Sequence, residues 1–117
     1  MDNFDTPNML KAADELDRKN YSAALVLLVP LAEAGNPRAQ CFLGNFYHFG
    51  WGVEPDGKKA AELYLKVAAQ NIREQHLSAI AYQNLSTLNV TGAPGVEPDF
   101  EKAAKYRARA IEIGLGM

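Results

Sequence analysis

Residues 43–56 read Leu-Gly-Asn-Phe-Tyr-His-Phe-Gly-Trp-Gly-Val-Glu-Pro-Asp, and this pattern returns at residues 85–99 as Leu-Ser-Thr-Leu-Asn-Val-Thr-Gly-Ala-Pro-Gly-Val-Glu-Pro-Asp. The second copy contains one additional loop residue, and each copy is followed by Lys-Ala-Ala, at 59–61 and 102–104. A fixed period of this length indicates a repeat protein, in which similar supersecondary units stack and bury their apolar faces against one another.

A third and weaker copy lies upstream. Its matching positions are Ala24, Leu28, Leu31, Ala32 and Gly35, which correspond to Ala60, Tyr64, Val67, Ala68 and Asn71. The chain of 117 residues therefore divides into one domain of three units, at about 6–35, 37–71 and 74–114. The first unit lacks the Gly-Val-Glu-Pro-Asp loop.

Each unit is expected to contain two helices. Thr6, Asp56 and Asp99 each stand before a helical segment, where an oxygen-bearing side chain caps the first free backbone N–H groups. Residues 72–77 have no counterpart between the first two units and contain no Gly or Pro, so we expect them to extend a helix. The predicted helices span residues 7–18, 21–34, 38–49, 57–70, 74–90 and 100–113.

The repeated residues resemble a known family. The pattern consists of Ala39-Gln40, Leu43-Gly44, Tyr47, Gly50, Gly52-Val53, Asp56, Lys59-Ala60, Tyr64 and Ala68-Ala69. It is similar to the Sel1-like repeat, a relative of the tetratricopeptide repeat, closely over 37–71, in degraded form over 79–114 and partially over 20–35. The resemblance implies an all-α fold, a short right-handed α/α solenoid of three antiparallel helix pairs, which serves as an adaptor in protein complexes.

Composition narrows the classes of partner. The net charge of −2 provides no excess of cations for a nucleic-acid backbone. The longest apolar run, residues 23–32, is about half of the ~20 residues that cross a bilayer. The first residues lack the basic start of a secretory signal, and one cysteine makes no internal disulfide. We expect a cytoplasmic protein without a nucleic-acid or membrane partner.

Catalytic chemistry finds little support in the residues. Cys41 and His48 are the only nucleophile and base close in sequence, and seven helical residues separate them by ~10 Å. The two histidines have no carboxylate at a convincing metal-ligand spacing. We therefore expect no enzyme, cofactor or metal site. The alternative is a hydrolase or β-lactam-binding enzyme, which the resemblance suggests through cysteine-rich relatives, although their cysteine pairs are absent here.

A stripe on the helix at 38–49 suggests a binding surface. At 100° per residue around the helix axis, Phe42, Asn45 and Phe49 lie within about 40° of Arg38. The core-facing positions centre near 140° from Arg38. The equivalent stripe of the last unit is more polar, and its amides and hydroxyls suit a peptide backbone. The central question is whether Phe42 packs on neighbouring units or lines a groove. The predicted partner-binding residues are Arg38, Phe42, Asn45, Phe49, Trp51, Ile80, Asn84 and Thr87.

The predicted partner is a protein or peptide, held on the concave helical face. A bacterial immunity protein that neutralises a cognate toxin or effector is a second version of the same function. The chain itself is expected to be a monomer or a weak homo-oligomer, because apolar residues near its end can seek a partner. Residues 1–36 carry six acids against three bases, and residues 100–117 carry four bases against two acids. The apolar residues near the end of the chain that can seek a partner are Ile111, Ile113, Leu115 and Met117.

Overall fold

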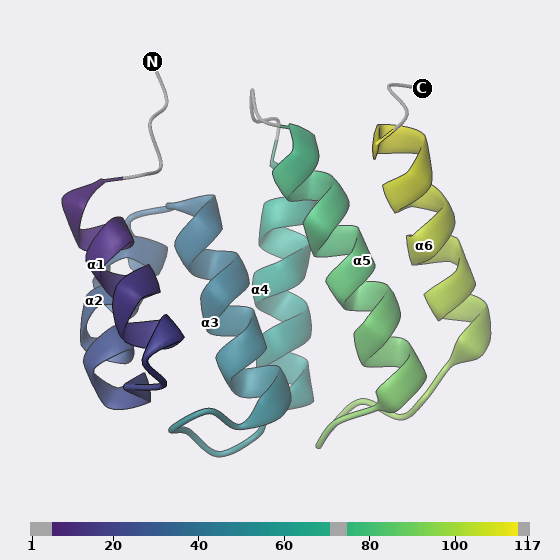
Figure 1. Cartoon of the computed structure of the whole chain (residues 1–117). Coiled ribbons are helices and arrows are strands. Elements are labelled where there is room, and N and C mark those ends of the chain that lie inside the picture. The colour runs from purple at the N-terminus through teal and green to yellow at the C-terminus, as the bar shows by residue number, and fades with distance from the viewer. Residues whose placement is uncertain (1–5, 71–74, 115–117) are drawn as a thin grey trace.

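The computed structural model describes residues 6–70 and 75–114. Over these ranges the ordered elements are helices, joined by short turns and by two longer loops (Figure 1). An isolated bridge between Ala93 and Val96 lies in the second of these loops. The helices are α1 (Pro7–Asp17), α2 (Tyr21–Glu33), α3 (Pro37–Phe49), α4 (Gly57–Ala69), α5 (Gln75–Thr91) and α6 (Phe100–Gly114).

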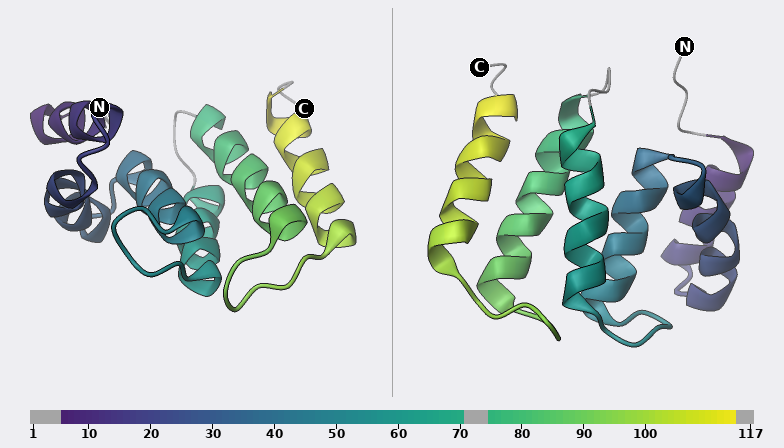
Figure 2. Two further views of the ribbon diagram at one scale, coloured as in Figure 1. Left: turned by 60° about the horizontal axis from the view of Figure 1, so that its bottom comes forward. Right: turned by 180° about the vertical axis from the view of Figure 1, so that it is seen from behind.

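The helices pack in chain order as antiparallel pairs. Each helix contacts the next along the chain, and α3 also reaches α5. Figures 1 and 2 show α1, α3 and α5 on one side of the stack, with α2 and α4 behind them. The prediction of an all-α solenoid built from helix pairs is confirmed.

Local sequence explains where the helices begin. The side-chain oxygens of Thr6, Asp56 and Asp99 accept hydrogen bonds from backbone N–H groups three residues later, at 3.2, 3.1 and 3.0 Å. The three predicted caps are thereby confirmed. Asn36 is a fourth cap that the sequence analysis missed, because α3 begins at Pro37, one residue before the predicted start. Proline suits this first position, where its missing N–H costs nothing.

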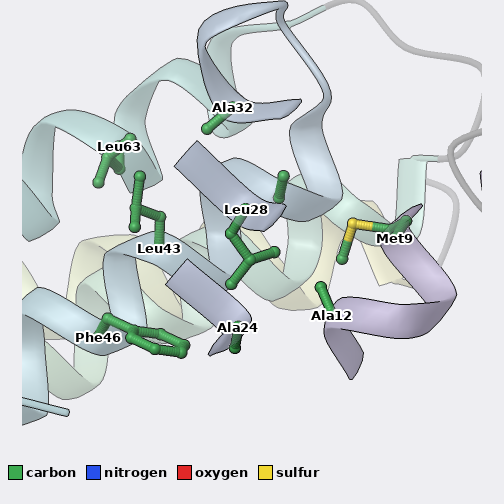
Figure 3. Packing of buried hydrophobic residues seen from close by; sticks show 9 residues of the cluster. Met9, Ala12, Ala24, Leu28, Ala32, Leu43, Phe46 and Leu63 are labelled. Carbon is green, nitrogen blue, oxygen red and sulfur yellow. The ribbon is translucent and has the colours of Figure 1, made fainter. Parts of the chain in front are cut away.

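The core is divided along the stack. One cluster joins α1, α2, α3 and α4, and its members include Met9, Leu28 and Phe46 (Figure 3). Another joins α4 to α5 through Tyr64, Leu85 and neighbouring residues. Each helix pair therefore buries its apolar side chains mainly against its neighbours, as expected for a solenoid.

Gly44 of α3 lies against the ring of Tyr64 on α4. A Cβ atom at this position would lie 2.5 Å from Cε1 of Tyr64, whose side chain is fully buried. The structure thus places an aromatic ring against this glycine. In the last unit Ser86 occupies the equivalent position, and its hydroxyl donates to the carbonyl of Ala103 at 2.9 Å.

Each of the two repeated loops rests on the preceding helix pair. In the first loop, Gly52 lies against Tyr21 at the start of α2, where an added Cβ would be 3.0 Å from the Cβ of Tyr21. In the second loop, the carbonyl of Pro94 accepts a hydrogen bond of 2.7 Å from the N–H of Gly57 at the start of α4. The loops thus link neighbouring units.

The helix extension predicted over residues 72–77 is confirmed in part. Residues 75–77 form the start of α5, which is four residues longer than α3 or α4. The remaining residues, 72–74, lie outside the described ranges.

A candidate partner-binding groove between α3 and α5

A groove of about 230 Å³ lies between α3 and α5. Five of the eight predicted binding residues meet there, although α3 and α5 are separated in the sequence by α4. Cys41, His76 and Leu77 also line this surface, although helical phase did not predict them there. The groove is lined by Arg38, Cys41, Phe42, Asn45, His76, Leu77, Ile80 and Asn84.

The floor and walls of the groove are largely apolar. Phe42 is half-buried, since it packs against the first core cluster and also lines the groove. Both alternatives considered for this residue therefore hold in part. Leu77 is buried beneath the groove, and Ile80 is 40% exposed at its edge. Burial raises the pKa of the Cys41 thiol to about 12, so this side chain stays neutral at physiological pH.

Two amide side chains contribute polar groups to the groove, in addition to Arg38 and His76. Oδ1 of Asn45 accepts a hydrogen bond of 2.6 Å from the hydroxyl of Tyr64, which rises from α4 behind it. This bond fixes the orientation of the amide and leaves its Nδ2 group to donate outward. The Asn84 amide faces the same groove from α5 and forms no hydrogen bond within residues 6–70 and 75–114.

A chain of polar contacts continues from Asn45 into the protein. The hydroxyl of Tyr64 lies 3.4 Å from Nδ1 of His48, and Nε2 of His48 lies 3.2 Å from the Thr91 hydroxyl on α5. Burial lowers the pKa of His48 below its usual value of 6.5 and favours the neutral ring. These contacts link the orientation of the Asn45 amide in the groove to the packing of α3, α4 and α5.

The predicted residues Phe49 and Trp51 lie outside the groove lining. The Phe49 ring is 51% exposed and stacks on His48 and Trp51, with centroids 4.1 and 5.2 Å apart. Trp51 is half-buried because its ring also stacks on Tyr21, at 5.7 Å. The indole thus fastens the first loop to the start of α2. A binding role for either ring stays a prediction.

Thr87, the remaining predicted residue, lies on an adjoining surface. It is exposed, and its hydroxyl donates to the carbonyl of Gln83 at 3.1 Å. It lines a hollow with Asn84, Val90 and Arg107 on the side of α5 that faces α6. Its side chain is therefore separated from the groove, although Asn84 borders both.

His48 and Cys41, the base and nucleophile considered above, form no hydrogen bond with each other within the described residues. Nδ1 of His48 contacts the hydroxyl of Tyr64, and Nε2 contacts the hydroxyl of Thr91, so neither ring nitrogen is directed at Cys41. No group of three or more His, Cys, Asp or Glu side chains suited to a metal ion occurs among the residues that the structure describes. Nor does the described part of the chain contain a helix long and apolar enough to span a membrane.

The stacked helix pairs and the groove between them define a helical-repeat protein. A family model described as the Sel1 repeat matches residues 37–72 and 79–115, which together make up more than half of the chain. The chain therefore belongs to the Sel1 repeat family. The two matches coincide with the pairs α3–α4 and α5–α6. The assignment of residues 6–35 as a divergent first unit stays a prediction.

A comparison with curated proteins gives one informative relative. The ERAD-associated E3 ubiquitin-protein ligase component HRD3B of Arabidopsis thaliana is 29% identical over 96 residues. The aligned segment covers 82% of this chain and 15% of that protein, so the chain spans only a small part of its relative. No solved structure matches the chain.

Proposed function

We propose that this chain is a protein-interaction module that binds an extended segment of a partner protein in the groove between α3 and α5. Sel1 repeats and the similarity to a component of a ubiquitin-ligase complex support an interaction role. The observation that carries the proposal is the meeting of Phe42, Ile80 and two amide side chains in one hollow between successive repeats.

The chemistry of the groove suggests how a peptide is held. An apolar side chain of the partner enters between Phe42 and Ile80, where its burial provides most of the affinity. Nδ2 of Asn45 donates to a peptide carbonyl, and the free amide of Asn84 both donates and accepts. Main-chain hydrogen bonds of this kind supply affinity, and the side-chain pocket supplies specificity.

The finer assignments belong to the same proposal. We place a non-catalytic function in the cytoplasm. An adaptor and a bacterial immunity protein use the same groove, and the neighbouring genes distinguish them. The hydrolase or β-lactam-binding alternative requires saturable turnover by the purified protein that is lost when His48 or Cys41 is replaced.

A random-peptide phage library panned on the purified chain tests the groove. We expect selected peptides to share an apolar residue, and we expect Ile80→Glu to weaken their binding at least about tenfold in calorimetry, which corresponds to about 1.4 kcal/mol. Asn84→Ala should weaken it less. The control is Val26→Glu, because Val26 is 74% exposed on α2, far from the groove. Equal affinities for the Ile80 and Val26 variants would show that the peptides bind elsewhere.

A further inference from the structure

The last helix pair presents a second surface, which borders the groove at Asn84. Two adjoining hollows of about 350 and 430 Å³ lie along α5 and α6, and both are lined by Ser86, Val90 and Arg107. Val90, Phe100 and Ile111 are 48%, 69% and 50% exposed. We call these two hollows the α5–α6 furrow. Three large apolar side chains exposed on one surface indicate an interaction site.

The repeat shows what kind of element fits this surface. At the offset of the repeat, Ala103 and Arg107 of α6 correspond to Ala60 and Tyr64 of α4. Ala60 and Tyr64 are fully buried, because α5, the first helix of the next pair, packs over them on the side that α3 leaves open. Among the helices that the structure describes, none covers Arg107 in this way. The furrow is therefore shaped for the first helix of another pair.

Charge indicates which helix that is. Arg107 is exposed at the centre of the furrow and forms no ion pair with any described residue. Residues 100–117 carry four bases against two acids, whereas residues 1–36 carry six acids against three bases. On α1, Leu10 is 58% exposed, and Asp14 and Asp17 follow it on the same side of the helix. An apolar residue followed by two acids complements a furrow that exposes three apolar side chains and an arginine.

We propose that a second copy of this chain docks head to tail, with α1 of one copy seated in the α5–α6 furrow of the next. Leu10 would pack among Val90, Phe100 and Ile111, while Asp14 or Asp17 pairs with Arg107. Because the two contacting surfaces differ, each added copy leaves one furrow open. Association therefore continues beyond a dimer as concentration rises. This inference is independent of the proposed peptide groove.

Sedimentation velocity of the wild-type chain, from about 10 μM to about 1 mM, gives the first test. We expect the average mass to rise with concentration, and to rise less in 1 M salt, because the screening length falls to about 3 Å there. A monomer throughout this range at low salt would overturn the proposal.

A pair of blocked variants tests the orientation. Leu10→Glu with Asp14→Lys blocks the α1 surface, and Phe100→Glu with Arg107→Glu blocks the furrow. All four side chains are exposed, and the Asp14–Arg18 ion pair that is lost is a solvent-exposed contact of 3.4 Å. Each variant alone should stay monomeric, whereas their equimolar mixture should form a heterodimer and nothing larger.

Two results would contradict the head-to-tail arrangement. One is self-association of either blocked variant alone, which would indicate a symmetric contact, and the other is a mixture that stays monomeric. As a milder version, Arg107→Glu alone should weaken association at least about tenfold, and adding either Asp14→Arg or Asp17→Arg to the same chain should restore it. Failure of both charge reversals to restore association would equally reject the pairing.

Discussion

Replacing Gly44 with alanine should destabilise the protein, although the same change in an open helix would stabilise it. The added Cβ would lie 2.5, 2.9 and 3.1 Å from three ring carbons of Tyr64. Ordinary carbon contacts are about 3.5–4.0 Å, so the ring or the two helices must move by about 1 Å. Tyr64 is fully buried, and its hydroxyl is bonded to Asn45, so the ring has no open space to enter.

The expected size follows from two opposing effects. Overpacking of a tight core costs about 1–3 kcal/mol, and replacing glycine inside a helix gains about 0.5–1 kcal/mol. The net loss in the free energy of unfolding should be about 1 kcal/mol, with an upper limit of about 2.5 kcal/mol. Urea unfolding followed by circular dichroism measures it as a lower midpoint at an unchanged slope.

Two further variants separate the clash from other causes. Gly114→Ala is the control, because its added Cβ meets nothing within 4 Å. Tyr64→Leu removes the ring, so Gly44→Ala added to that background should become neutral or stabilising. If Gly44→Ala stabilises the wild-type protein, or costs as much in the Tyr64→Leu background, the close contact does not determine the packing of α3 on α4.

Three other predictions follow from local chemistry. Asp56→Ala removes the cap of α4 and should lower the free energy of unfolding by about 1 kcal/mol in urea titrations, whereas the exposed Glu62→Ala should change it little. With a pKa near 12, about one Cys41 thiol in 10⁴ is ionised at pH 8, so iodoacetamide should label the native chain far more slowly than the unfolded chain, as mass spectrometry can show. The pKa of His48 is lowered in the folded protein, so the unfolded chain binds the proton first and stability should fall as the pH drops below about 6.5. Urea titrations from pH 7 to 5 should show a smaller loss for His48→Gln, and an equal loss would contradict the assignment.

The helices and their caps could be predicted because their signals are local. A capping side chain acts three residues away, and the repeat compares one helix pair directly with the next. Part of the groove could also be predicted from the sequence. Helical phase places Phe42 and Asn45 on one side of α3, and Ile80 and Asn84 on one side of α5. Stacking of successive units then brings the two stripes together.

Contacts between distant residues were the part that could not be predicted. Trp51 stacks on Tyr21, 30 residues earlier, so the indole that suggested a binding anchor is partly used to hold a loop. The hydroxyl of Tyr64, 19 residues away, donates a hydrogen bond to Oδ1 of Asn45. This acceptor is therefore less available to a partner than the residue type alone suggests. His76 and Leu77 belong to the insertion, for which the repeat offers no template.

The hydrogen bond between Gly57 and Pro94 has a practical consequence for dividing this protein. The second loop belongs by sequence to the α5–α6 pair. Its Pro94 carbonyl nevertheless accepts the hydrogen bond from the Gly57 N–H in the first turn of α4. A fragment that ends at residue 70 would keep every residue of α3 and α4 but lose the partner of the Gly57 N–H. Anyone who transplants this helix pair into another scaffold should therefore carry along, or replace, the loop at residues 93–96.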